Sequence, residues 1–208
     1  MFNRLCKIIF IRHGATSFTE ENRLYSREDY PPLNEQGREE TKRLIKWLKA
    51  SCPNVDAIYS SSALRAVQSA REIAKSYGGD FEILDELYER KSGKWGGLTY
   101  SQIQQKYPEE FALYKKNPSE YVVEGAESRK DSNKRVGRLI DKIIHQNPYK
   151  TLLVITHAGV IQSAISSALK IDPTHQDKIY IPTGSATQIS YFNDWASLVY
   201  SGYVPFEK

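Results

Sequence analysis

Two apolar runs that each stop at a histidine constrain the fold of this chain more than any other feature. In the first, the apolar residues 8–11 are followed at once by Arg12, His13 and Gly14. Four large apolar residues without polar alternation are typical of a strand covered on both faces, as in a parallel sheet. In open α/β sheets, ligands bind at the carboxyl ends of such strands. We therefore expect Arg12 and His13 to lie in a binding site.

The second run repeats this design. The apolar residues 152–155 are followed by Thr156, His157, Ala158 and Gly159, so two of the four histidines of the chain end two buried strands. If these strands are neighbours, both imidazoles share one crevice with the arginine of the first run. A guanidinium group matches phosphate oxygens with two parallel hydrogen bonds, so the pair of runs indicates an oxyanion site that is suited to phosphate.

Strand and helix patterns alternate along the rest of the chain. Helices are predicted over residues 35–50, 63–77, 128–147 and 160–169, with one or two short helices over 100–116, and strands over 55–60, 81–84, 187–192 and 196–204. Loops are expected over residues 15–33 and 85–99. The alternation predicts a three-layer α/β/α sandwich with a mostly parallel central sheet, plus an antiparallel edge strand after the turn at Asn193 and Asp194.

Local signals add three narrower expectations. Residues 60–62 are three serines, which we interpret as caps of the helix that follows. The basic residues of the 128–147 helix are expected on its solvated side; they are Arg129, Lys130, Lys134, Arg135 and Arg138. Trp95 is expected near the entrance of the site.

Composition bounds the class of protein. The 208 residues, 40% hydrophobic and 26% charged, are consistent with a single domain over residues 1–208. A net charge of +4 is compatible with anionic substrates and too small for a dedicated nucleic-acid binder. Two cysteines provide no disulfide framework, and no apolar run approaches the ~18 residues of a membrane span. With no room for a signal peptide before the first strand, we expect a cytoplasmic protein without nucleic-acid or membrane partners; a homodimer stays an open alternative.

Four motifs together resemble one known family. They are Arg12-His13-Gly14, the 60–66 segment with Arg65, Leu87-Tyr88-Glu89 followed by residues 93–97, and Thr156-His157-Ala158-Gly159. Their identity, order and spacing resemble the histidine phosphatase superfamily, in its phosphoglycerate-mutase-like branch, over nearly the whole chain. Residues 24–26 and 32–34 are similar to the α-ribazole phosphatases of that branch.

The resemblance implies a role for each motif. His13 would be the nucleophile that carries a transient phosphohistidine. Arg12, Arg65 and His157 would hold the phosphoryl oxygens, and Glu89 would be the general acid. Covalent catalysis of this kind divides one difficult displacement into two easier ones. The scheme requires no metal and no cofactor.

Several assignments within the resemblance are less direct. Glu86 competes with Glu89 and is ranked second, because Glu89 has the matching distance to Gly93. Thr16, Thr19 and the backbone N–H of Ala158 are the expected substrate contacts. The sequence departs from the common family pattern, in ways that affect substrate contacts, at Ala15, Thr19, Ser26, Arg27 and Gly96.

The resemblance favours a metal-independent phosphomonoesterase that acts on a small metabolite. Candidates are α-ribazole 5′-phosphate, phosphoserine and sugar phosphates, with broad specificity as a further alternative. A cofactor-dependent phosphoglycerate mutase is the nearest rival, but about thirty residues between Gly97 and Gly125 look too few for the cage that excludes water in mutases. A catalytically silent domain that binds a phosphorylated ligand is the rival from another class. Residues 17–32 and 95–127 are the loops expected to select the substrate, and whether they form a lid is left open.

Overall fold

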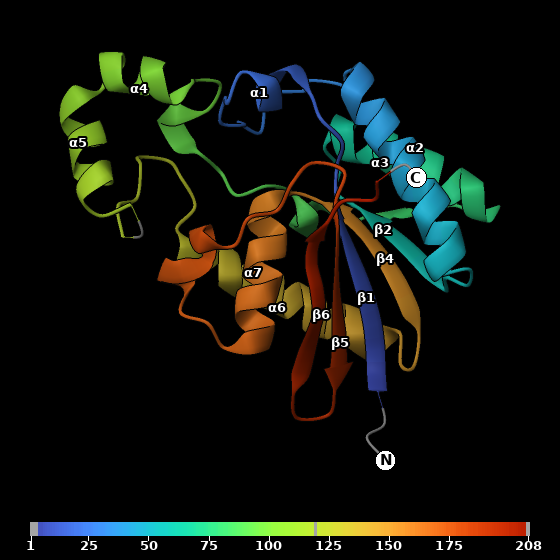
Figure 1. The fold of residues 1–208 in the computed structure, drawn as a ribbon. Helices are drawn as coiled ribbons and strands as arrows, with labels where there is room; N and C mark the ends of the chain where they lie inside the picture. The colour runs from blue at the N-terminus through green and yellow to red at the C-terminus, as the bar shows by residue number, and fades with distance from the viewer. Residues whose placement is uncertain (1–3, 119, 207–208) are drawn as a thin grey trace.

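A six-stranded sheet forms the centre of the computed structural model, which describes residues 4–118 and 120–206. Its strands lie in the order β3-β2-β4-β1-β5-β6. Their bounds are Arg4–Arg12 for β1, Ala57–Ser60 for β2, Glu82–Ile83 for β3, Thr151–Thr156 for β4, Ala186–Phe192 for β5 and Ala196–Tyr203 for β6. Figure 1 shows β1 and β4 side by side in the middle of this sheet.

The two apolar runs form neighbouring strands, which is the condition for the two histidines to share one crevice. β1 pairs with β4 in parallel, with Ile8 opposite Leu152 and Arg12 opposite Thr156. The parallel strands β3, β2, β4 and β1 are followed by β5, which is antiparallel to β1, and by β6, which is antiparallel to β5. The prediction of a mostly parallel sheet with an antiparallel addition at one edge is confirmed.

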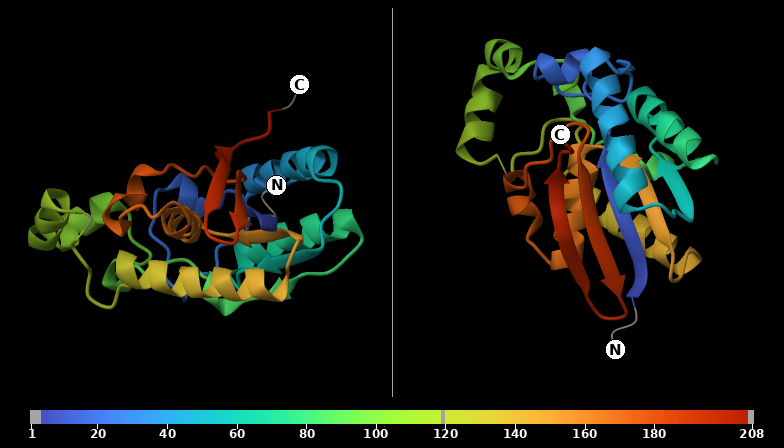
Figure 2. Two further views of the ribbon diagram at one scale, coloured as in Figure 1. Left: turned by 90° about the horizontal axis from the view of Figure 1, so that it is seen from below. Right: turned by 45° about the vertical axis from the view of Figure 1, so that its right-hand side comes forward.

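Helices cover both faces of the sheet, which gives the expected three layers (Figures 1 and 2). Alternate residues of β1 point to opposite faces, because strand side chains have a period of two. Ile8 and Phe10 pack in the core cluster of α6 (Arg129–Gln146) and α7 (Ala158–Leu169). Ile9 and Ile11 pack in the cluster of α2 (Glu35–Ser51) and α3 (Leu64–Tyr77). Both faces of the sheet are therefore covered at β1, as apolar runs without polar alternation predict.

A small helical segment stands beyond the carboxyl ends of β1 and β4, beside the short helix α1 (Ser17–Glu20) (Figure 1). It contains α4 (Tyr100–Lys106) and α5 (Pro108–Lys116), separated at Pro108 as predicted. Its own core consists of Trp95, Ile103, Phe111 and Val123. The expectation that Trp95 lies at the site entrance is wrong, because only 2% of this side chain is exposed and its ring packs inside the segment.

Three other local expectations are corrected. Residues 15–33 are not entirely loop, because Thr16 and Thr19 form a capping box that begins α1. The serines at 60–62 do not cap α3, which begins after Ala63 without a side-chain cap. On α6, Arg129 is buried and ion-paired with Asp177, so it is not part of the solvated side. Arg135, also expected there, is partly buried and ion-paired with Glu127.

Candidate active site

The carboxyl ends of β1 and β4 bring the two histidines together. Because the strands are paired in register, the rings of His13 and His157 lie with centroids 5.1 Å apart. The backbone N–H of His13 donates to the Thr156 carbonyl of β4 at 3.0 Å. Gly14 then passes so close to α2 that a Cβ on it would lie 2.3 Å from the Gly37 carbonyl oxygen, so only glycine fits this turn.

Hydrogen bonds fix the tautomer of His13. Its Nδ1 lies 2.8 Å from the Gly14 carbonyl oxygen, which can only accept, so Nδ1 carries the proton. Its Nε2 lies 3.1 Å from Nε of Arg65, which can only donate, so Nε2 carries the lone pair. The imidazole therefore presents an unprotonated Nε2, the form in which a histidine acts as a nucleophile.

Arg65 also contacts the second histidine. Its Nη2 lies 3.2 Å from Nδ1 of His157, and Nε2 of His157 lies 2.9 Å from the Ser61 hydroxyl. Since Arg65 can only donate, His157 accepts at Nδ1 and donates from Nε2 to Ser61. One guanidinium group thus orients both imidazoles.

The same environment keeps both imidazoles neutral. Burial, reinforced by the charges of Arg65 and Arg12, holds the pKa of His13 well below its ordinary value of 6.5. Burial and the neighbouring Arg65 lower the pKa of His157 in the same way. The nucleophilic form of His13 is therefore the form present at neutral pH.

The two arginines of the cluster are not neutralised by ion pairs. In the described part of the chain neither Arg12 nor Arg65 forms an ion pair with a carboxylate, and the Nε of Arg12 and the Nη1 of Arg65 are buried without a hydrogen-bond partner. Burial lowers the pKa of both guanidinium groups, and the charge of Glu89 is the largest influence that raises the pKa of Arg12. Desolvated cations with unused donors are costly unless an anion is bound, so the site is built for an oxyanion.

A cavity of about 560 Å³ opens above this cluster. Arg12, His13 and Glu89 line it, whereas Arg65 and His157 are completely buried behind its wall. The ring of Tyr25 covers Arg65, whose guanidinium carbon lies 3.7 Å from the ring centroid. The cavity is large enough for a small metabolite.

Glu89 lines the same cavity as His13 and lies against the start of α7. One carboxylate oxygen accepts the backbone N–H of Gly159 at 3.2 Å, and the other accepts the N–H of Arg90 at 2.8 Å. A Cβ on Gly159 would lie 2.4 Å from the Glu89 carboxylate, so this glycine allows the approach. Glu86 is exposed on the outer side, which supports ranking it second.

Of the three expected substrate contacts, Ala158 and Thr19 line the cavity and Thr16 does not. Ala158 lines the cavity as the first residue of α7, where free N–H groups attract anions. The Thr16 hydroxyl is buried and lies 2.5 Å from the Tyr25 hydroxyl, and Thr19 Oγ1 donates to the Thr16 carbonyl at 2.8 Å. These two hydroxyl groups serve the capping of α1, and their contact with substrate stays a prediction.

Sequence reasoning missed two partners of the cluster. Ser61 was interpreted as a helix cap, although its position beside Arg65 in the same motif was the signal for a role in the site. Glu40 is a buried carboxylate that accepts the Ala15 N–H at 2.8 Å and the Thr183 hydroxyl at 3.0 Å. Its signal was a charged residue on the apolar stripe of its helix, four residues before Leu44.

The described residues contain neither a metal-binding cluster nor a membrane-spanning helix. Among residues 4–118 and 120–206, no group of three or more His, Cys, Asp or Glu side chains is arranged to hold a metal ion. Every helix in those same ranges is too short or too polar to span a bilayer.

Comparison with known proteins agrees with this geometry. Phosphoserine phosphatase 1 of Hydrogenobacter thermophilus is 27% identical over 168 residues, which cover 81% of this chain and 78% of the relative. The solved structure of Bacillus stearothermophilus YhfR has a TM-score of 0.86 and 26% identity, over 95% of this chain and 96% of that one. An Escherichia coli protein provisionally described as an alpha-ribazole-5′-P phosphatase shares the fold, with a TM-score of 0.85 and 21% identity over 98% and 99% of the two chains.

The family model of the histidine phosphatase superfamily (branch 1) matches residues 8–202, a range that begins in β1 and ends in β6. The match therefore includes both strand ends, Arg65, Glu89 and most of the central sheet. This protein belongs to the histidine phosphatase superfamily, branch 1, and is a phosphatase enzyme.

Proposed function

We propose that this enzyme is a metal-independent phosphomonoesterase that hydrolyses a small phosphorylated metabolite through a phosphohistidine on His13. The observation that carries the proposal is the fixed tautomer of His13. Its Nδ1–H is held by the Gly14 carbonyl, so the lone pair of Nε2 is the reactive electron pair of the cluster. Burial keeps the pKa of this imidazole low, so protonation does not compete with attack at neutral pH.

In the first step, the Nε–H of Arg65 turns from Nε2 of His13 to a phosphoryl oxygen, which frees the lone pair of Nε2. Nε2 then attacks phosphorus, and the bond from phosphorus to the ester oxygen breaks. The carboxyl group of Glu89 gives its proton to the departing oxygen, so the leaving group departs as a neutral alcohol. Arg12 and Arg65 balance the charge on the transferring phosphoryl oxygens, since phosphoryl transfer depends mainly on positioning and electrostatics.

In the second step, water attacks the phosphohistidine from the side that the alcohol has left. Glu89, now a carboxylate, takes a proton from that water, and the bond between phosphorus and Nε2 breaks. Inorganic phosphate leaves, and His13 and Glu89 return to their starting forms. Every proton and electron pair is thus supplied by side chains, water or substrate.

The outer part of the cavity favours a leaving group with both apolar and polar parts. Phe18, Tyr100 and Tyr180 line it together with Arg90 and Gln162. Aromatic walls suit a ring-bearing group such as that of α-ribazole 5′-phosphate, and Arg90 suits the carboxylate of phosphoserine. The names of the relatives support the same two substrates. Broad specificity is the remaining alternative for a cavity of this size.

The test is release of inorganic phosphate in the presence of EDTA. The panel contains α-ribazole 5′-phosphate, phosphoserine, 3-phosphoglycerate and sugar phosphates, and the matched control is His13→Asn. We expect EDTA-resistant release from at least one substrate and its loss in the variant. Activity that EDTA removes would contradict metal independence.

The same assay separates the rival functions. Isomerisation of 3-phosphoglycerate without phosphate release would identify a mutase. Binding of phosphorylated ligands without either reaction would identify a silent binding domain.

A further inference from the structure

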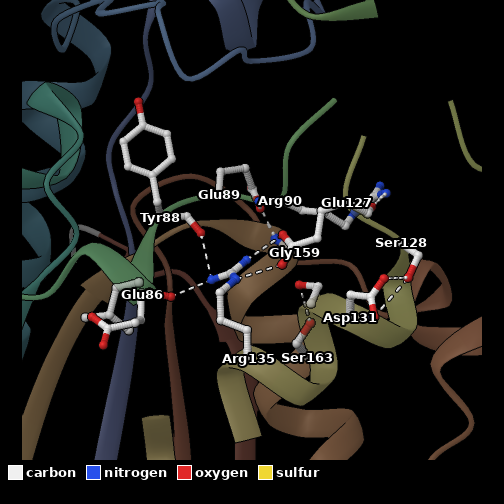
Figure 3. Close-up of polar contacts among 12 residues, drawn as sticks. Glu86, Tyr88, Glu89, Arg90, Glu127, Ser128, Asp131, Arg135, Gly159 and Ser163 are labelled. Atoms are coloured by element: carbon white, nitrogen blue, oxygen red, sulfur yellow. Dashed lines mark hydrogen bonds and ion pairs between the residues drawn. The ribbon is translucent and has the colours of Figure 1, made fainter. Parts of the chain in front are cut away.

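We propose that Arg135 is a positioning residue for Glu89. Together with Glu127, it fixes the position, relative to α7, of the backbone segment that carries this acid. This inference rests on the proposed function, in which Glu89 is the general acid. We call the Arg135–Glu127 ion pair the Arg135 clamp. It lies beside the segment that carries Glu89 (Figure 3).

All three nitrogens of the Arg135 guanidinium group donate hydrogen bonds. Nε and Nη2 donate to the two carboxylate oxygens of Glu127, at 2.8 Å and 2.7 Å. Nη1 donates to the backbone carbonyls of Glu86 and of Tyr88, the latter at 3.2 Å. A bidentate ion pair that also bonds backbone is geometrically specific, unlike a single surface contact.

The clamp acts on both sides of Glu89 in the sequence. Arg135 holds the carbonyls of Glu86 and Tyr88, which precede it, and the backbone N–H of Glu127 donates to the Lys91 carbonyl, which follows it, at 3.0 Å. These bonds restrict the backbone of a segment that otherwise contains only short 3₁₀ turns. The segment is therefore held in part from α6 and the residues just before it, and in part from β4, where Thr156 Oγ1 donates to the Leu87 carbonyl at 2.7 Å.

The helix that holds the segment is itself tied to the helix that binds the carboxylate. Arg135 lies on α6, whereas the N–H that Glu89 accepts belongs to Gly159 on α7. The Ser132 and Ser163 hydroxyl groups lie 3.2 Å apart across the buried contact between these helices. The backbone anchor and the carboxylate anchor of Glu89 thus belong to one packed pair of helices.

Substitution of Arg135 is expected to lower activity by an amount that depends on the leaving group of the substrate. Alcohols need a proton as they depart, whereas p-nitrophenolate does not, so a misplaced acid slows alkyl phosphates selectively. We expect Arg135→Gln to lower kcat/KM for phosphoserine or glycerol phosphate by about 10- to 100-fold, part of what general acid catalysis contributes. For p-nitrophenyl phosphate we expect a change below about 3-fold, because that reaction does not use the acid. Arg138→Gln, an exposed position on the same helix, is the matched control and should change neither rate.

The decisive measurement is the double variant Glu89→Gln/Arg135→Gln. If Arg135 acts through Glu89, its substitution adds no further loss once the acid is absent, which a merely structural role would not produce. Equal slowing of both substrate classes, or additive losses in the double variant, would overturn the inference. If Arg135→Gln does not fold, Glu127→Gln, which keeps Arg135, is measured with the same two outcomes.

Failure of the inference is distinguishable from failure of the proposed function. Selective slowing of alkyl phosphates by Glu89→Gln but not by Arg135→Gln or Glu127→Gln would overturn the clamp alone. No phosphate release from any substrate by the wild-type chain would overturn the proposed function and, with it, the clamp.

Discussion

Arg65 donates a hydrogen bond from Nε to Nε2 of His13 across 3.1 Å, so a buried cation holds the lone pair that is proposed to attack phosphorus. The contact has two consequences. It orients the ring, and it lowers the pKa of the imidazole together with burial. A substrate phosphoryl group must therefore take over this hydrogen bond from Nε2 before the lone pair can attack.

We expect that catalysis requires the two separate N–H donors of the Arg65 guanidinium group, and not only its charge. Lysine in its place cannot contact His13 and His157 in the same way, because a single ammonium replaces two separate donors. We predict that Arg65→Lys lowers kcat/KM by about 10²-fold or more, comparable to removing a donor that stabilises transition-state charge. Steady-state kinetics beside thermal unfolding would check this, and a variant within a few-fold of wild type would contradict it.

The low pKa values of the two histidines predict how stability depends on pH. The folded-state pKa of His13 and His157 lies below the unfolded value of 6.5, so the unfolded chain binds more protons once the pH falls below that value. Their contribution to the free energy of unfolding is therefore complete above about pH 6.5 and is lost below it, by up to about 2.7 kcal/mol per pH unit for the pair. It should level off only near their folded-state pKa values.

Urea unfolding between about pH 7.5 and pH 5.5 measures this dependence. The matched comparison is His13→Asn, which retains the carboxylates and His157. Its slope should be smaller by up to about 1.4 kcal/mol per pH unit, the contribution of one proton. Identical slopes in the two proteins would show that His13 is not held neutral by the fold.

Substitution of the proposed acid should separate substrates by leaving group. We predict that Glu89→Gln slows alkyl phosphates by about 10²- to 10⁴-fold, the usual contribution of a general acid, and slows p-nitrophenyl phosphate far less. The measurement is kcat/KM for both classes with wild type and variant. Equal slowing would assign Glu89 a binding or structural role.

A methyl group at Gly159 should disturb the acid without weakening the helix. Its Cβ would lie 2.4 Å from the Glu89 carboxylate, so that side chain must move. Gly159 is the second residue of α7, and alanine is a better helix former than glycine, so α7 itself should not be destabilised. We predict selective slowing of alkyl phosphates with unchanged or higher thermal stability. Gly137→Ala in α6 is the control, since its Cβ would meet only the Ser167 hydroxyl, at 3.3 Å; equal kinetics in both variants would contradict the prediction.

The fold could be predicted from the sequence where one physical signal dominated. The uninterrupted runs at 8–11 and 152–155 require burial on both faces, and only a covered sheet provides that. Adjacent parallel strands then bring Arg12, His13 and His157 to one edge. The separation of α4 from α5 was equally direct, because Pro108 suits the first turn of a helix and not its interior.

The sequence could not predict which partner a polar side chain selects. Serine is a good helix cap, but the Ser61 hydroxyl is hydrogen-bonded to His157 and the Ser62 hydroxyl to Asp85. The pattern of α6 places Arg135 on the solvated side, because periodicity detects neither its ion pair with Glu127 nor its bonds to backbone carbonyls 47 and 49 residues away. The position of Tyr25 over Arg65 depends on the path of a loop, for which the residues carry no regular pattern.

The central claim is that phosphorus passes through His13 in two displacements. Each in-line displacement inverts the configuration at phosphorus, so two successive displacements restore it. The most direct measurement uses a phosphorothioate monoester made chiral at phosphorus with two oxygen isotopes, which the wild-type chain hydrolyses in water of the third isotope. We predict overall retention of configuration. Overall inversion would mean that water attacks the substrate directly, and it would contradict the phosphohistidine mechanism.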